Sequence, residues 1–471
     1  MSSETKRGIA PPLTDLPIST ASRGFYDGFS RQVTIPAKII VSLIILWAIF
    51  FPVQANETLT AANSTIIASF TGWYVYLVAA LMTTCAVLAV IPKVGRLRIG
   101  TADEGPEFSR LSWFSMLFGA GIGIGMLTYS TGEPLAHFSN NPEIITGEAG
   151  AQTAEAVHSA YLYTFLHWGF AAWGTYALVG LAIGYVAYRR GLPLTIRSAL
   201  APLFGRTMSG PIGHLFDVVA VVATILGVAV TMGLGVEQFV VGLARVGVGD
   251  WLLDADGSSS VAAIVVALTV LVGASTISAL SGVGKGIKWL SNINLGLSFL
   301  LLLLFVVVGS SLYALELFSS GLVDYVAHLI PLSLTIFHNS GPFGEELVTW
   351  QRDWSVFYWA WWIAFAPFVG MFIARISRGR TIREYILGVV LVPSLVCFVW
   401  MTLLGGTAIA LELDGSAAGT IVNAPMADQL YATLAVLLDP GFAMVVSGLI
   451  VLLLMTYLVT SADSAILIIN T

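Results

Sequence analysis

Long apolar runs, separated by short polar or glycine- and proline-rich segments, divide the chain along its whole length. Many of these runs approach or exceed the roughly 20 residues that a helix needs to cross the hydrocarbon core of a bilayer. The pattern predicts ten membrane-spanning helices, over residues 36–53, 70–92, 113–131, 157–188, 212–243, 261–280, 290–312, 354–376, 386–410 and 442–469. We therefore predict an all-α polytopic membrane protein.

Three segments lie outside this pattern. Residues 1–35 are polar and lack the apolar core of a signal peptide, so we expect a cytoplasmic N-terminal tail. Residues 321–334 are apolar but short and interrupted by Asp324 and His328, which predicts a helix lying in the outer membrane interface. The chain stops at Thr471, within or just after the tenth predicted span.

Composition excludes a soluble protein. The 471 residues are 57% hydrophobic and 10% charged, with a mean hydropathy of +0.86, whereas a soluble domain has about 25% charged residues. With a cytoplasmic N-terminus, the N-terminal segment and the cytoplasmic loops hold all lysines and arginines except Arg245 and Arg352, which is 19 of 21. This asymmetry follows the positive-inside rule and predicts a multi-pass protein of the cell (inner) membrane.

Ionisable residues inside the predicted spans are few. Asp217, Glu237 and Asp463 lie near span ends, and without a ladder of carboxylates a proton-relay pump is disfavoured. The six histidines lack the spacing of metal ligands, so we expect hydrogen-bonded side chains. No pair of nucleophile and base occurs inside the spans, and we predict neither an enzyme nor a bound cofactor.

The third predicted span contains four alternate glycines, from Gly119 to Gly125. Close helix packing needs only two small residues at a spacing of four. Because each glycine costs a helix about 1 kcal/mol relative to alanine, we favour a helix broken at mid-membrane, whose freed N–H and C=O groups face a ligand.

Aromatic and hydroxyl residues supply the remaining candidate chemistry. Trp168, Trp173 and Tyr176 lie on one face in the middle of the fourth span, and the eighth span holds a tryptophan-rich segment with Trp359 and Trp362. Aromatic faces suit a cation that donates no hydrogen bonds. In the tenth span, intrahelical bonding of the hydroxyls in the segment 460–464 and a site for a small hard cation remain open alternatives.

Together, the glycine-rich third span, the segments 167–176 and 353–362, and the segment 460–464 resemble the betaine/carnitine/choline transporter family. The resemblance implies two lead-in helices (36–110) and a five-plus-five inverted-repeat, LeuT-like core. In that core, residues 111–318 form the first repeat, 319–353 an interfacial connecting helix and 354–471 a second repeat. The second repeat is expected to be truncated, because two helices and a tail of the family pattern are not present.

The resemblance also implies site residues. Those of the substrate site are Trp168, Trp173, Tyr176, Trp362 and Trp359 with the flexible stretch Gly121, Gly123 and Gly125. Those of one sodium site are the carbonyls of Gly119, Ile122 and Tyr457 with the hydroxyls of Thr460 and Ser461. A second sodium site matches at Thr224 and Phe368, but Val228 replaces a threonine and Thr231 only partly substitutes for it. Phe372 and Phe365 fall at the cytoplasmic gate, although Phe365 and Thr128 depart from the usual residue types.

The function implied is sodium-coupled uptake of a zwitterionic or cationic osmolyte by alternating access: glycine betaine, choline, carnitine, ectoine or dimethylsulfoniopropionate. No basic residue occurs in the segment 217–241, where sodium-independent exchangers of the family carry an arginine. Two alternatives remain, a sodium-independent exchanger and an inactive truncated fragment. The expected partners are the lipid bilayer and two further copies in a homotrimer, with no nucleic acid.

Overall fold

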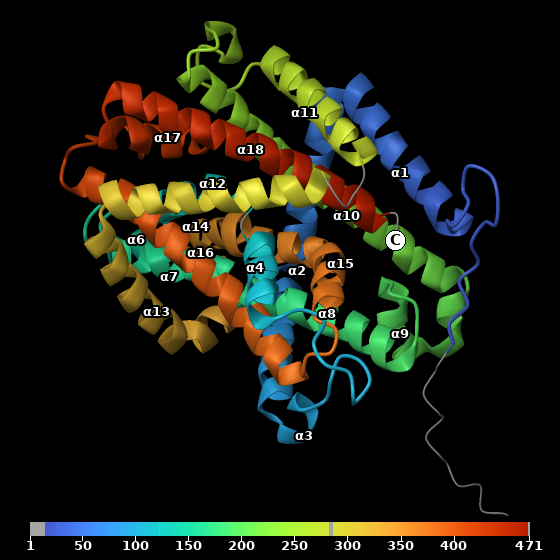
Figure 1. Ribbon diagram of the computed structural model, residues 1–471. Coiled ribbons are helices and arrows are strands. Elements are labelled where there is room, and N and C mark those ends of the chain that lie inside the picture. Colours follow the sequence, from blue (N-terminus) through green and yellow to red (C-terminus); the bar gives the residue numbers. More distant parts are fainter. Residues whose placement is uncertain (1–14, 122, 282–285, 470–471) are drawn as a thin grey trace, which may run out of the picture.

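The computed structural model describes residues 15–121, 123–281 and 286–469. These residues form a bundle of long helices in which β structure is confined to isolated bridges (Figure 1). Ten helical segments of this part of the chain are long and apolar enough to cross a membrane. Large apolar side chains such as Leu43, Val266 and Val307 are exposed on the outside of the bundle, where lipid covers them in a membrane. The predicted all-α polytopic membrane protein is confirmed.

The helices follow the predicted spans through the first half of the chain, except that α2 (Pro52–Val90) begins at Pro52, 18 residues before the predicted start of the second span at residue 70. They are α1 (Arg31–Phe50), α2 (Pro52–Val90), α3 (Pro92–Gly95), α4 (Arg110–Gly121), α5 (Ile124–Ser139), α6 (Pro142–Thr146), α7 (Ala156–Trp168), α8 (Phe170–Arg190), α9 (Ile196–Phe204), η1 (Gly205–Ser209) and α10 (Pro211–Arg245).

The second half continues with η2 (Asp250–Leu252), α11 (Val261–Ser281), α12 (Gly286–Val308), α13 (Ser311–Leu334), α14 (Gly344–Gln351), η3 (Arg352–Val356), α15 (Phe357–Ile376), α16 (Ile382–Leu413), α17 (Met426–Leu437) and α18 (Pro440–Ile469). The five-residue η3 has π-helical geometry, which often occurs at functional sites.

Two predicted spans are each divided into two helices. The third consists of α4 and α5, which are individually too short to count among the ten candidate spans. The fourth is interrupted at Gly169, between α7 and α8. A Cβ atom at Gly169 would lie 2.4 Å from the carbonyl oxygen of Phe165 and 2.7 Å from the hydroxyl of Tyr325. The absence of a side chain therefore allows this close packing.

The connecting helix is longer than the sequence pattern predicted. The seventh span was expected to run to residue 312, but α12 ends at Val308 and the 24-residue α13 begins at Ser311. The amide of Ser310 donates to Thr407 Oγ1 at 3.1 Å, which fixes the turn between the two helices. The estimate of a short helix at 321–334 was wrong, and α13 meets the length and hydropathy of a membrane span.

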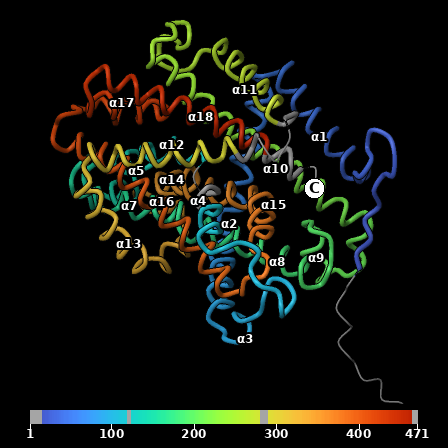
Figure 2. The backbone as a smooth tube through the Cα atoms, in the orientation of Figure 1, coloured from blue at the N-terminus to red at the C-terminus, as the bar shows by residue number. Residues whose placement is uncertain are grey.

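The centre of the bundle is formed by α5, α8, α15 and α16. Helix α8 packs against α15 and α2, and α16 packs against α5 and α13. Helix α18 runs beside α12 and also contacts α10 (Figures 1 and 2). Fully buried side chains such as Tyr161, Tyr385 and Trp400 fill this centre, whereas α1 is almost entirely exposed. The central helices therefore supply a rigid frame for the site.

Two loops with many basic residues meet at one end of the bundle. The amide of Ile99 donates to the carbonyl of Arg380 at 2.9 Å, and the amide of Ile382 donates to Leu97 at 2.8 Å. Arg98 also donates to the carbonyl of Gly379. The loops after the second and eighth predicted spans thus lie on the same side, as the positive-inside pattern requires.

Candidate functional site

A cavity of about 510 Å³ lies between the central helices and α10, α12 and α18. Its volume falls within the roughly 300–1,000 Å³ of typical small-molecule sites. The residues that line it are Ser115, Met116, Gly123, Ile124, Gly125, Met126, Trp168, Ala172, Trp173, Tyr176, Val228, Thr231, Met232, Ser291, Asn292, Asn294, Leu295, Trp361, Trp362, Phe365, Phe368, Val369, Phe372, Tyr457, Thr460 and Ser461. None of these lining residues is charged.

The broken third span opens onto this cavity. Helix α4 ends at Gly121 and α5 begins at Ile124, with Gly123 as its N-cap and part of the cavity wall. A Cβ atom at Gly125 would lie 3.3 Å from the ring of Trp361 and 3.5 Å from that of Trp168. The predicted interruption of the helix is confirmed, whereas its position at mid-membrane and its role toward a ligand stay predictions. The break presents a helix N-terminus, which favours negative charge, and a helix C-terminus, which favours positive charge.

Four aromatic residues predicted from the sequence converge on the cavity. Trp168 comes from the end of α7, Trp173 and Tyr176 from α8, and Trp362 from α15. The ring of Trp362 meets that of Trp168 edge-on, with centroids 5.3 Å apart, and that of Tyr176 at 6.0 Å. Trp361, in the same tryptophan-rich segment but not among the predicted site residues, stacks its ring on Trp362 at 5.0 Å and lines the same cavity. These rings form an aromatic wall.

The interruption at Gly169 positions this wall. Trp168 is the last residue of α7, and the carbonyl oxygen of the preceding His167 accepts a hydrogen bond from Trp362 Nε1 at 3.0 Å. The amide of Phe170 donates to the hydroxyl of Tyr325 at 2.9 Å. The backbone groups beside the interruption are therefore satisfied by side chains of other helices, and one of these bonds links α7 directly to α15.

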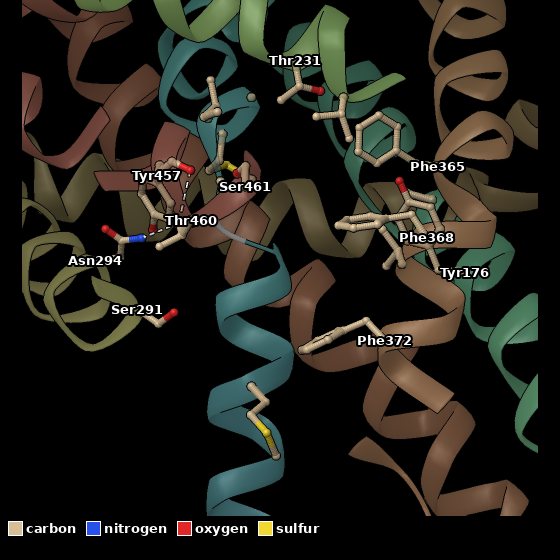
Figure 3. A pocket seen from close by; sticks show the side chains of 18 of the residues that line it. Tyr176, Thr231, Ser291, Asn294, Phe365, Phe368, Phe372, Tyr457, Thr460 and Ser461 are labelled. Carbon is tan, nitrogen blue, oxygen red and sulfur yellow. Dashed lines mark hydrogen bonds between the residues drawn. The ribbon is translucent and has the colours of Figure 1, made fainter. Parts of the chain in front are cut away.

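The polar side chains of Asn294, Thr460 and Ser461 lie across the cavity from the phenylalanine rings, whereas Thr231 lies beside Phe365 (Figure 3). Tyr457, Thr460 and Ser461 of α18, which the family resemblance assigns to a sodium site, line the cavity. The hydroxyl of Thr460 donates to the carbonyl of Thr456 at 2.9 Å and accepts from Asn294 Nδ2 at 3.0 Å. The other amide atom, Asn294 Oδ1, is buried without a hydrogen-bond partner. The sequence analysis missed Asn294, although a polar amide in an apolar span was the available signal.

The gate candidates Phe365 and Phe372 line the cavity together with Phe368 (Figure 3). Thr224 is buried in α10 outside the lining, whereas Val228 and Thr231 of the same helix contribute to it. The second sodium site of the family pattern is therefore only partly represented in the cavity wall.

Four predicted residues remain, of which the structure describes three. Trp359 is buried but lies outside the lining, with its ring 5.9 Å from that of His167. Gly119 and Gly121 belong to α4. Ile122, predicted to contribute a carbonyl to the sodium site, lies outside the described residues.

A buried carboxylate behind the aromatic wall was missed by the sequence analysis. Glu133, two residues beyond the predicted third span, is fully buried because α5 continues to Ser139. Its Oε1 atom lies 2.7 Å from His167 Nδ1 and 3.3 Å from His137 Nε2. The expectation that these histidines are hydrogen-bonded is confirmed. Glu133 was not considered among the intramembrane carboxylates because the third span was predicted to end at residue 131, whereas α5 continues to Ser139.

Comparisons with known proteins agree with this geometry. Residues 32–471 match the model of betaine/carnitine/choline family transporters. The chain is 37% identical over 427 residues to "Glycine betaine transporter OpuD" of Bacillus subtilis, covering 90% of this chain and 79% of that protein. It is 41% identical over 347 residues to "High-affinity choline transport protein" of Escherichia coli K12, covering 74% of this chain.

A "Probable glycine betaine transporter" of Desulfitobacterium hafniense is 35% identical over 439 residues, which cover 93% of this chain and 84% of that protein. The matched region spans only 49% of the length of the Escherichia coli protein. These relatives are named as transporters, not enzymes. With a family match over nearly its whole length and an uncharged aromatic cavity at its centre, the chain belongs to the betaine/carnitine/choline transporter family.

Proposed function

We propose that this chain mediates sodium-coupled uptake of a quaternary-ammonium solute by alternating access, in the inner membrane and with a cytoplasmic N-terminus. The observation that carries the proposal is the convergence of Trp168, Trp173, Tyr176 and Trp362 on one uncharged cavity. Tyr457, Thr460 and Ser461 line the same cavity, so solute and ion sites would adjoin.

The chemistry of the wall favours a quaternary over a primary amine. A trimethylammonium group has no N–H to satisfy and is attracted to aromatic faces by about 2 kcal/mol when desolvated. A primary ammonium would lose its hydrogen bonds to water and find no carboxylate among the lining residues. The proposed solutes are therefore glycine betaine, choline and related osmolytes.

The start of α5 supports binding of a zwitterion. Gly123, at the N-cap of this 16-residue helix, lines the cavity, so its first amides lie next to the bound solute. A helix N-terminus stabilises a carboxylate. Glycine betaine would place its ammonium group against the rings and its carboxylate toward α5.

The hydroxyls on α18 support coupling to sodium. Hard cations of this kind take oxygen ligands, and transporters with broken helices provide them as carbonyls and hydroxyls. One charge entering down 100 mV gains about 2.3 kcal/mol, and a tenfold ion gradient adds about 1.4 kcal/mol. Helix α10 carries no basic residue in the segment 217–241, which favours sodium coupling over sodium-independent exchange. Assembly as a homotrimer stays a prediction.

Uptake into proteoliposomes tests the proposal. Labelled glycine betaine and labelled choline are offered with an inward sodium gradient or with sodium replaced by potassium at equal membrane potential. We expect accumulation of at least one solute only with sodium. Equal accumulation in both media would refute sodium coupling. Uptake that requires internal solute instead of sodium would establish the exchanger alternative.

A further inference from the structure

The fully buried Glu133 is not part of the cavity wall, but it is bonded to that wall. Its Oε2 atom accepts hydrogen bonds from Trp168 Nε1 at 2.5 Å and from the hydroxyl of Tyr358. Its Oε1 atom faces His137 and His167. The carboxylate therefore joins α5, α7 and α15 immediately behind the aromatic wall.

The groups around Glu133 match the hydrogen-bonding capacity of an ionised carboxylate. An indole N–H can only donate, so the oxygen facing Trp168 must accept. An ionised carboxylate offers about four acceptor positions and no donor, and four donor-capable groups surround this one. Ser355 Oγ, 3.0 Å from His167 Nε2, supplies a partner for the far side of that imidazole.

This charge lacks a permanent cationic partner. The hydrogen-bond partners of Glu133 in the described chain are two histidines, a tryptophan and a tyrosine. A buried charge is costly unless it is paired. Three residues of types that bind metal ions lie close together here, because the ligating atoms of Glu133, His137 and His167 are within 4.8 Å of one another. However, Glu133 Oε1 is already engaged in direct hydrogen bonds with the two histidines.

The ring of Trp168 lies between this charge and the cavity. Its Nε1 is bonded to Glu133, while the ring lines the cavity and meets Trp362 edge-on. A hydrogen bond to an ionised acceptor is about twice as strong as a neutral one, and it polarises the donor group. Polarisation of the indole toward its π face strengthens the attraction of that face for a cation.

We propose that Glu133 is the counter-charge of the bound quaternary ammonium and acts through Trp168 as a positioning residue. This inference rests on the proposed function. The negative charge is held one ring away from the solute. A cation therefore gains electrostatic stabilisation without a carboxylate in the cavity, where primary amines and water would compete for it. Glu133 thereby selects charged ammonium groups over uncharged groups of the same shape.

The test compares choline with neohexyl alcohol, in which an uncharged tert-butyl group replaces the trimethylammonium group. Affinities are measured on the purified full chain by displacement of labelled choline. In Glu133→Gln, the amide oxygen can still accept from Trp168 and Tyr358 while its NH₂ group faces the imidazoles. We expect the preference for choline over neohexyl alcohol to fall about tenfold, equivalent to about 1.4 kcal/mol.

Two further variants separate charge from structure. Glu133→Asp keeps the charge but shortens the side chain, so we expect weaker binding of both compounds with the preference retained. If Glu133→Gln does not fold, Glu133→Asp alone tests the proposal. Loss of the preference for choline over neohexyl alcohol in Glu133→Asp would contradict the proposal. Glu143→Gln, on α6 and outside the cavity lining, is the matched control and should leave both affinities unchanged.

A double-mutant cycle tests the route through the indole. In a Trp168→Phe background the link to Glu133 is absent, and Glu133→Gln should then change the preference by much less than tenfold. An equal loss of affinity for both compounds, or an unchanged preference, in Glu133→Gln would overturn the inference. Failure of the unaltered chain to bind either choline or glycine betaine would instead refute the proposed function, and the inference with it.

Discussion

Replacing Trp362 with leucine should remove one face of the proposed solute site. Trp362 is buried in the bundle, with only 6% of the residue exposed. It contacts the rings of Trp168, Tyr176 and Trp361. Its Nε1 also donates to the carbonyl of His167. Leucine retains an apolar side chain but provides no π face and no donor.

The magnitude follows from the loss of one desolvated cation–π contact. At about 2 kcal/mol for such a contact, the affinity should fall about 30-fold, because each factor of ten corresponds to about 1.4 kcal/mol. The lost bond to His167 also leaves a buried carbonyl without its partner, which costs a further 1 kcal/mol or so of stability. Trp362→Phe keeps a ring and should lose much less affinity.

The assay is the concentration dependence of glycine betaine and choline uptake in cells, with the amount of protein in the membrane measured in parallel. Trp73→Leu is the matched control, because Trp73 of α2 is 52% exposed on the outside of the bundle. We expect no change in the control. An unchanged half-saturation concentration in Trp362→Leu, with normal membrane levels, would refute the assignment of the aromatic wall.

Two other predictions concern the ion site and the frame. In the unaltered chain, the buried amide of Asn294 donates to Thr460, and its Oδ1 atom has no hydrogen-bond partner beside the proposed ion site. Asn294→Ala removes both groups, so we expect a several-fold higher sodium concentration for half-maximal uptake. We expect the same effect in the double variant Thr460→Ala with Ser461→Ala. Thr269→Ala, at an exposed position of α11 outside the cavity lining, is the control, and equal sodium dependence in this variant and in Asn294→Ala would contradict the role of Asn294. Gly169→Ala places a Cβ atom 2.4 Å from a backbone oxygen, so we expect a loss of about 1–3 kcal/mol measured as a lower Tm in detergent; an unchanged Tm would contradict the packing argument.

The sequence alone located most of the helices. A membrane span needs about 20 apolar residues whatever surrounds it, so hydropathy identified nine of the ten candidate spans, and the remaining predicted span corresponds to the pair α4 and α5. The glycines before α5 predicted the broken helix, because their cost in a helix is local. The aromatic residues of α8 were recognisable for a similar reason, since rings in mid-span have no interfacial role.

The helix boundaries predicted from the sequence were wrong where the local structure depends on contacts with distant parts of the chain. The interruption at Gly169 requires Tyr325 and Phe398 beside it, and the start of α13 requires Thr407. Neither contact is visible in a hydrophobic pattern. The connecting helix was predicted too short because its first residues were assigned to the seventh span, and because Asp324, which bonds His158, was taken as an interruption of the apolar run.

The proposed solute site likewise combines features that follow from the local sequence with features that depend on tertiary contacts. The sequence by itself determined which residue types could bind a quaternary ammonium, because rings and hydroxyls keep their chemistry in any context. Only the tertiary structure placed Trp168 against Trp362 and put Glu133 behind them. Glu133 and Tyr358 are 225 positions apart, and a hydrogen bond between such residues depends on how α5 and α15 pack. The chemistry of the cavity was therefore encoded locally, whereas the charge behind its wall arose from packing alone.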